Sequence, residues 1–291
     1  MLNVCRNPYY LESQGMFVDC GHCRSCRLKR RAEWSLRMKH ETSTSGGLAL
    51  FIMLSYDGDH LPKGGTLVKK DLQDFFKRLR INLQRDGDNS KFKYYACGEY
   101  GPQTCRPHYH LIIIGLSMRH ADLIFKSWGK CQSVGFGCKL ISTADEKAFS
   151  YVSGYTCKKL GKHYNSNFRD NTGKQPEFQL NSSGLGKKYA QTIELFNGLM
   201  RENGTWRVPP RYYRKILGLC ADLYKNVIAL RDEQVLDFVL NAYASSGLAK
   251  KIRSAIAPLK HWLFIPLMDK VRVECDERLK KRELNWRVNA V

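Results

Sequence analysis

Two histidines stand two positions apart in the run Pro-His-Tyr-His at residues 107–110. Residues at this spacing in a β-strand project to the same face, so His108 and His110 are able to hold one divalent cation. Glu99 lies in the preceding predicted strand, and a hairpin would bring its carboxylate to the same cation. Two imidazoles and a carboxylate suit Mg²⁺ or Mn²⁺ polarising a phosphate, and also Zn²⁺. The alternatives are a chance histidine pair and a surface carboxylate in a turn.

Two tyrosines follow on a predicted helix. Tyr151 and Tyr155 are spaced i, i+4 and share one helix face with Lys158 and Lys159. A phenolate attacks a phosphodiester to give a covalent phosphotyrosine, and nearby lysines stabilise the developing negative charge. Ordinary amphipathic packing is the alternative. Together with the histidines, the tyrosines favour a nuclease-type site.

A cysteine cluster lies near the N-terminus. Cys20, Cys23 and Cys26 have CxxCxxC spacing, and either Cys5 or His22 would complete a tetrahedral site. Three thiols in seven residues of a chain without an export signal predict a structural Zn²⁺ site rather than buried free thiols. The other cysteines show no ligand spacing and are expected to be small buried apolar residues.

Basic residues crowd the predicted helix that follows the cluster. Their summed positive charge would attract phosphates, although such a run is often only a solvated helix face. The residues assigned to DNA contact are Arg24, Arg27, Lys29, Arg30 and Arg31.

The elements that must position these residues follow from hydrophobic periodicity. Strands are predicted at 48–57, 91–100, 106–115 and 134–142, and helices at 68–83, 118–128 and 145–160. The order β-α-β-β-α-β-α is the split βαβ arrangement. We therefore predict an α+β fold whose antiparallel sheet carries helices on one face.

Three segments are expected along the chain. Residues 1–45 form a Cys-rich, zinc-binding and basic segment, residues 46–200 the catalytic domain, and residues 201–291 a mainly helical C-terminal region. Gly184–Lys188 lacks the length and the Ser/Thr of a P-loop, so this segment is expected to be a plain loop. No helicase or ATPase module is detectable, so unwinding would need a partner.

Composition narrows the partner class. The chain has 291 residues with 48 Lys+Arg against 27 Asp+Glu, a formal net charge of +21. Its 43% hydrophobic content supports a folded core. No apolar run is long enough to span a bilayer and no secretory signal is visible, so an intracellular protein with no membrane association is expected. Such an excess of positive charge points to nucleic acid.

The motifs in this order resemble the HUH endonucleases that initiate rolling-circle replication, and in detail the replication initiators of gokushovirus-type microviruses, small single-stranded DNA phages. The resemblance covers residues 15–215. It rests on CGxCxxC with a basic helix, TLVKKDLQDFFKRLR, CGEYG, RPHYH, YVSGYTCKK, SSGLGKKY and VPPRYY.

This resemblance implies roles for the residues above. His108 and His110 would hold Mg²⁺ or Mn²⁺ with Glu99 as third ligand, Tyr151 and Tyr155 would be the paired nucleophiles, and Lys158 or Lys159 would match the basic residue after them. Tyr109 departs from the family, which usually has a bulky aliphatic residue there.

The implied activity is nicking and rejoining of a single-stranded DNA origin through a 5′-phosphotyrosine. The expected partners are the viral replication origin and the host helicase and polymerase, in the cytoplasm of a bacterial host. Two alternatives stay open: a non-catalytic single-stranded nucleic-acid-binding or genome-packaging protein, and a transposase or relaxase with the same HUH chemistry.

Overall fold

The computed structural model describes residues 5, 8–14, 16–131, 139–158, 168–196 and 198–219. The chain divides into two compact units: Arg30–Ile193 form one, and the segments on either side of it form the other. The division at 45/46 and 200/201 expected from the sequence stays a prediction.

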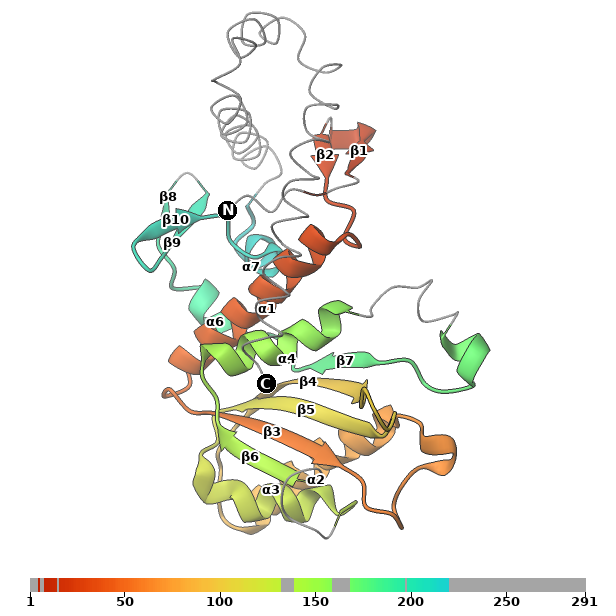
Figure 1. The fold of residues 1–291 in the computed structure, drawn as a ribbon. Helices are drawn as coiled ribbons and strands as arrows, with labels where there is room; N and C mark the ends of the chain where they lie inside the picture. The colour runs from red at the N-terminus through yellow and green to blue at the C-terminus, as the bar shows by residue number, and fades with distance from the viewer. Residues whose placement is uncertain are drawn as a thin grey trace, which may run out of the picture. The chain divides into compact units, whose positions relative to one another are not determined.

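A five-stranded antiparallel sheet is the centre of the unit Arg30–Ile193 (Figure 1). Its strand order is β6-β3-β5-β4-β7, so β3 pairs with both β5 and β6 although the chain leaves it through a helix. The strands are β3 (Ala49–Ser55), β4 (Lys93–Tyr100), β5 (Pro107–Ile114), β6 (Lys139–Thr143) and β7 (Phe178–Asn181). The predicted α+β class with an antiparallel sheet is confirmed.

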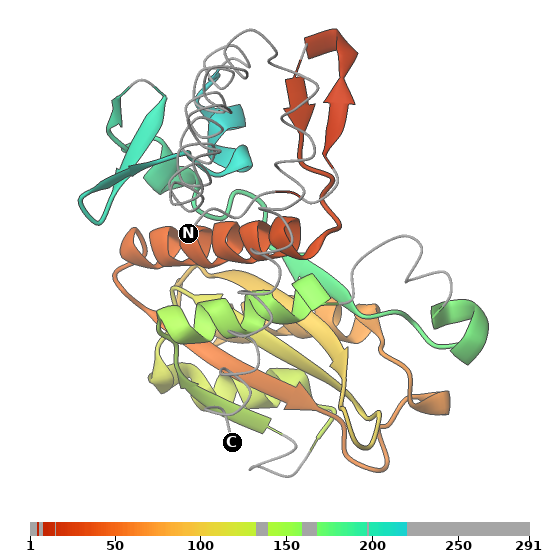
Figure 2. The same cartoon turned by 45° about the horizontal axis from the view of Figure 1, so that its top comes forward.

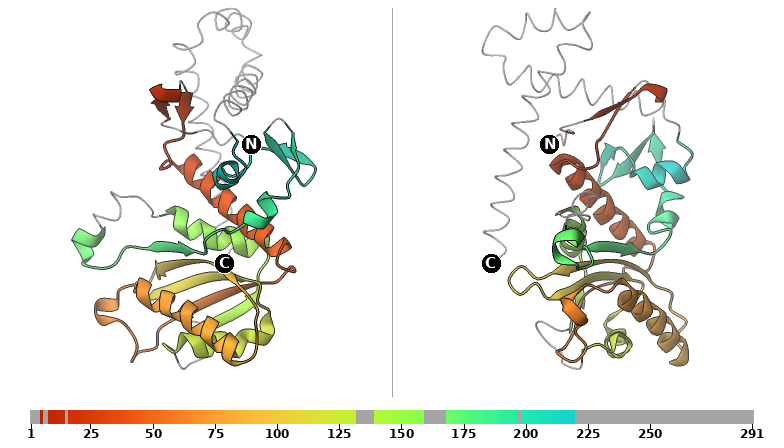
Figure 3. Two further views of the ribbon diagram at one scale, coloured as in Figure 1. Left: turned by 180° about the vertical axis from the view of Figure 1, so that it is seen from behind. Right: turned by 90° about the vertical axis from the view of Figure 1, so that its right-hand side faces the viewer.

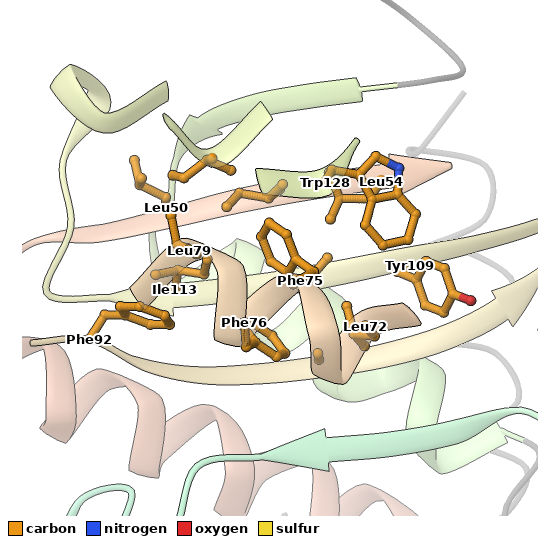
Figure 4. Close-up of a cluster of buried hydrophobic side chains, with 14 of the residues drawn as sticks. Leu50, Leu54, Leu72, Phe75, Phe76, Leu79, Phe92, Tyr109, Ile113 and Trp128 are labelled. Carbon is orange, nitrogen blue, oxygen red and sulfur yellow. The ribbon is translucent and has the colours of Figure 1, made fainter. Parts of the chain in front are cut away.

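One face of this sheet is covered by α2 (Lys69–Arg85) and α3 (Ala121–Trp128). Seen from behind, α2 lies across the strands (Figure 3). Its apolar residues recur at helical spacing and pack on β3 and β5, as the close-up of the core shows (Figure 4). The core side chains labelled there include Leu50, Leu54, Leu72, Phe75, Phe76, Leu79, Phe92, Ile113 and Trp128.

The opposite face is covered as well. A second cluster joins Met38 of α1 (Arg24–Ser43) and Val152 of α4 (Glu146–Lys158) to alternate residues of the same strands, and Figure 2 shows α4 over the sheet. The predicted placement of helices on one face is therefore corrected. The reason is visible in β5, where residues 111–114 are buried on both faces, as happens when helices cover a sheet on both sides.

The turn 183–186 is fixed by α1 and β4. Glu41 accepts a hydrogen bond from the Gly186 backbone N–H at 2.6 Å, and Arg37 donates to the Leu185 carbonyl. Lys93 contacts both Glu41 and the Gly184 carbonyl at 2.9 Å. Because the carboxylate of Glu41 occupies the Gly186 N–H, this turn has a structural role, as expected of a plain loop, and α6 (Lys187–Ala190) follows it.

The described part of the other unit has small sheets. β1 (Tyr9–Leu11) pairs with β2 (Met16–Val18), and β8 (Leu195–Phe196), β9 (Leu199–Glu202) and β10 (Thr205–Arg207) form a three-stranded antiparallel sheet before α7 (Arg211–Ile216). These strands were not predicted. Of the expected helical region 201–291, residues 220–291 lie outside the described residues, as do 132–138 of the predicted strand 134–142.

Among the described residues, no helix is long and apolar enough to cross a membrane.

Candidate metal site and tyrosine pair

The β4–β5 hairpin brings the predicted metal ligands together. Glu99 lies directly opposite His108 in the antiparallel register, and Cys97 lies opposite His110. Directly opposed residues share a face of the sheet, and so do residues two apart, so the carboxylate and both imidazoles point the same way. The hairpin therefore places the three donors where the sequence predicted them.

The donor atoms surround a small space. Glu99 Oε2 is 3.7 Å from His108 Nε2 and 3.5 Å from His110 Nε2, and the three donor atoms all lie within 4.8 Å of one another. Two donors each about 2.1 Å from one cation are about 3.0–3.6 Å apart, depending on the angle at the metal. The separations therefore fit a shared cation better than direct hydrogen bonds.

Hydrogen bonding around the triad also fits a cation. Glu99 Oε2 is buried and has no hydrogen-bond partner among the described residues, which is costly for a carboxylate unless a ligand satisfies it. His108 Nδ1 lies 3.1 Å from the Arg106 carbonyl. This contact favours a proton on Nδ1 and leaves the Nε2 lone pair facing Glu99, as outer partners of metal-bound histidines do.

The pKa values of two members keep them in the form that binds metal. Burial raises the pKa of Glu99, but hydrogen bonds and charge from His108 and His110 outweigh it, so the net pKa lies below its ordinary value. Burial lowers the pKa of His110, with Glu99 opposing only part of this shift. An ionised carboxylate and a neutral imidazole are the states that coordinate a cation.

Helix α4 places both tyrosines against this triad. The Tyr155 ring stacks on His110 with centroids 4.6 Å apart and planes 1° apart, while Tyr151 meets the same imidazole edge-on at 5.7 Å. The Tyr155 hydroxyl donates a hydrogen bond to that of Tyr151. The rings lie one helical turn apart on the face that packs on β4 and β5, so both phenols lie beside the candidate cation site.

Both phenols are protonated at neutral pH. Burial is the largest cause that raises the pKa of Tyr151 and of Tyr155, and the nearby Glu99 charge adds to it in each case. An attack by either hydroxyl therefore requires removal of its proton or positive charge close to its oxygen.

Arg31 anchors the tyrosine helix, a role that sequence reasoning missed. Its Nε donates to the Ser150 carbonyl at 2.8 Å and its Nη2 to Ser150 Oγ at 2.7 Å. A Cβ at Gly154 would lie 3.4 Å from the same Nε, so the guanidinium rests against α4 between the two tyrosines. A glycine between paired tyrosines was the available signal, but nothing in the sequence linked this helix to an arginine 119 positions before Ser150.

The other predicted basic residues are placed differently. Arg30 is exposed on α1, while Arg24, Arg27 and Lys29 are partly buried, and Lys29 forms an ion pair with Asp19 at 2.6 Å. Lys158 ends α4 with a side chain outside the described residues, and Lys159 lies outside them altogether. DNA contact by the α1 residues and a catalytic role for the lysines stay predictions.

The four N-terminal cysteines form a second candidate metal site. Their Sγ atoms all lie within 4.8 Å of one another, and Cys23 Sγ is 3.4 Å from Cys26 Sγ and 3.9 Å from Cys5 Sγ. Four sulfurs at about 2.3 Å from a tetrahedral Zn²⁺ are about 3.8 Å apart. The spacing therefore fits a Cys₄ zinc site.

Backbone donors around these sulfurs support thiolate character. Cys5 Sγ accepts from the Cys20 N–H, and Cys20 Sγ accepts from the N–H groups of His22 and Cys23. Burial opposes it, yet these bonds lower the pKa of Cys20 to about 7. The side chain of Cys5, not that of the exposed His22, completes the cluster.

Of the remaining cysteines, Cys97 is a buried free thiol as expected, whereas Cys105 is exposed. Cys131 is buried but disulfide-bonded, which corrects the expectation of a free thiol there.

Fold and site together define an α+β protein whose central sheet holds a His–Glu–His cluster beneath a helix with two tyrosines. Residues 49–160, which contain this whole arrangement, match the family model of the replication-associated protein ORF2. The resemblance to microvirus replication initiators seen in the motifs is thereby confirmed.

Individual relatives agree with this family. The chain is 30% identical over 187 residues to the replication-associated protein ORF2 of Spiroplasma virus 4, a match covering 59% of this chain and 56% of that protein. It is 29% identical over 218 residues to the replication-associated protein VP4 of Bdellovibrio phage phiMH2K, covering 67% and 65%. For the replication-associated protein ORF4 of Chlamydia phage 1 the values are 26% over 157 residues, 49% and 38%. The matches thus span about two fifths to two thirds of these relatives. No solved structure matches the chain.

Proposed function

We propose that the protein is a rolling-circle replication initiator that nicks and rejoins single-stranded DNA of the viral origin. The observation that carries this proposal is the stacking of Tyr155 on His110, which puts two phenols beside three candidate metal donors on one face of the sheet. The replication-associated relatives support the role in replication.

In the proposed reaction, the oxygen of one tyrosine attacks the scissile phosphorus. A Tyr O–P bond forms, the P–O3′ bond breaks, the phenol gives up its proton, and the departing 3′ oxygen takes up a proton to leave a 3′-OH. The 3′-OH primes synthesis, and the ester bond is conserved as a 5′-phosphotyrosine. No external energy source is needed for rejoining, because a 3′-OH attack on this ester reverses the exchange.

His108, His110 and Glu99 would hold Mg²⁺ or Mn²⁺, and a bound cation would place positive charge on the scissile phosphate. The chain's own residues orient the reaction: α4 presents the phenols, and Arg31 fixes α4 through Ser150. Two adjacent phenols suit two successive cleavages, the second while the first ester is still occupied.

The proposed structural role of Zn²⁺ at Cys5, Cys20, Cys23 and Cys26 is separate from this chemistry. The proposed partners are the single-stranded origin and the host helicase and polymerase, in the cytoplasm of the bacterial host.

Incubation of the protein with 5′- and 3′-labelled single-stranded oligonucleotides tiled across the viral genome, with added Mn²⁺, tests the activity. The expected product is a denaturant-resistant protein–DNA adduct carrying the 3′ fragment, with release of a fragment ending in 3′-OH. Binding without any adduct would support the non-catalytic alternative. Adducts on a host or plasmid transfer sequence, and none on viral DNA, would support the transposase or relaxase alternative.

A further inference from the structure

The sheet β8–β9–β10 has an unusual distribution of side chains. In its antiparallel register Phe196 lies opposite Leu199, and Trp206 lies opposite Arg201. Leu199 and Arg201 are two apart on the central strand β9, so all four side chains share one face. This face joins an aromatic residue on each outer strand to an arginine on the central one (Figure 1).

The aromatic face is the open face of this sheet. The exposed fractions are 60% for Phe196 and 42% for Trp206, and Arg201 is also exposed. The next residues along β9 behave oppositely, since Met200 and Glu202 on the other face are buried. Antiparallel sheets with one solvated face normally put polar residues outward, so the exposure of two large aromatic rings here calls for a ligand.

The rings and the charge are held in a regular arrangement. The centroids of Phe196 and Trp206 are 5.6 Å apart with planes inclined by 44°. No ion pair involves Arg201 among the described residues, so its guanidinium is available to an external anion. The Asn203-Gly204 turn between β9 and β10 has positive φ at both residues, a tight hairpin turn that fixes Trp206 opposite Arg201.

We infer that this aromatic–arginine face, defined by Phe196, Leu199, Arg201 and Trp206, binds single-stranded nucleic acid by stacking bases on the rings and pairing a phosphate with Arg201. Every base has a flat face that stacks on an aromatic ring, and the arginine adds charge that a protein partner's apolar patch would not need. The net charge of +21 points to the same polyanion. The inference rests on the proposed function in its substrate and adds a second contact surface for that strand.

The test is the affinity of the full-length protein for a fluorescent oligo(dT) without added Mn²⁺, measured by anisotropy. The double variant Phe196→Ala with Trp206→Ala is expected to bind about ten- to hundredfold more weakly, because stacking contributes about 1–3 kcal/mol per base. Tyr9→Ala is the matched control, since Tyr9 is 59% exposed on the separate β1–β2 hairpin and should bind normally. A melting curve of each variant verifies folding, and Trp206→Phe keeps a ring if the double variant does not fold.

The arginine gives an independent readout. Arg201→Gln should reduce the slope of log affinity against log salt by about 0.7, the value for one phosphate contact to a single strand. Photocrosslinking of 5-iodouracil oligonucleotides should label Phe196 or Trp206. Unchanged affinity and salt slope in folded variants would overturn the inference, and so would a loss of self-association without any change in DNA binding.

Because no Mn²⁺ is added, this binding test does not depend on cleavage. A protein that binds through the aromatic–arginine face but never forms an adduct would leave the inference standing and refute the proposed function. A protein that forms the adduct with unaltered binding in the ring variants would do the reverse.

Discussion

The two candidate metal sites differ in ligand type and in closure. At the cysteine cluster, four soft sulfurs surround one point and backbone N–H groups contact two of them. A tetrahedral metal there would have all its positions filled. At the β4–β5 hairpin, two imidazoles and one carboxylate supply three donors, and two phenols lie alongside. A metal there would keep positions for a substrate oxygen.

This difference separates stability from chemistry. Loss of a closed thiolate site removes folding free energy, because the site forms only when its ligands are brought together. Loss of the hairpin donors removes charge from a reaction while leaving a sheet buried on both faces by α1, α2, α3 and α4. The following experiments test whether the two sites divide the work in this way.

The largest effect is expected when both nucleophiles are removed. Tyr151→Phe with Tyr155→Phe keeps both rings on His110 and deletes only the hydroxyls, so the covalent adduct should fall at least about a thousandfold. Denaturing gels measure the adduct. Each single variant should retain first-strand nicking but fail in release of closed circles, which needs a second phenol. An adduct formed by the double variant would place the nucleophile elsewhere, with Tyr189 as the next described tyrosine to test.

Loss of the hairpin donors should come next. His108→Ala with His110→Ala is expected to lower Mn²⁺-dependent cleavage by about a thousandfold, since a bound cation contributes several kcal/mol to charge stabilisation. Binding to oligo(dT) and the melting temperature should change little. Equal loss of melting temperature here and in the cysteine variants would contradict the division between the two sites.

The cysteine site should show the opposite pattern. Cys23→Ser or Cys26→Ser is expected to reduce bound zinc, measured by elemental analysis, and to lower the melting temperature by about 5–10 °C. Cys105→Ser, at an exposed free thiol, is the matched control. Adduct formation below the new melting temperature should persist. Protein purified without chelators that contains no zinc would refute the structural assignment.

How much of this could be predicted depended on whether the signal was local. The spacing of His108 and His110 defines a strand face, and the i, i+4 spacing of Tyr151 and Tyr155 defines a helix face, so both pairs came from local geometry. The hairpin placed Glu99 because adjacent strands pair in a predictable register. The apolar residues 111–114 already implied burial of both sheet faces, but which helix would cover the second face depends on tertiary contacts.

Two features depended on contacts between distant residues or on a weak local signal. Cys5 reaches the other sulfurs from 15 residues before Cys20, and spacing alone could not choose it over His22. The β9–β10 hairpin had a local signal in Asn203-Gly204 between short alternating strands, but a helical pattern assigned to the following segment obscured it.

The smallest effect tests how the open site is positioned. Arg31→Ala should slow adduct formation by about tenfold, because α4 would lose the hydrogen bonds that fix Ser150 and the phenols would be less well aligned. Arg31→Lys keeps the charge but cannot reproduce the two-nitrogen contact, so it should resemble Arg31→Ala. Arg30→Ala removes the same charge from the neighbouring exposed position and should leave the rate unchanged. A contact role of Arg31 in DNA binding predicts weaker oligo(dT) affinity and a lower salt slope, whereas a positioning role predicts normal affinity with a slower single-turnover rate. Because Arg31 acts on the tyrosine helix and contacts neither metal site, its rate effect with unchanged zinc content would show that the open site depends on helix placement as well as on its ligands.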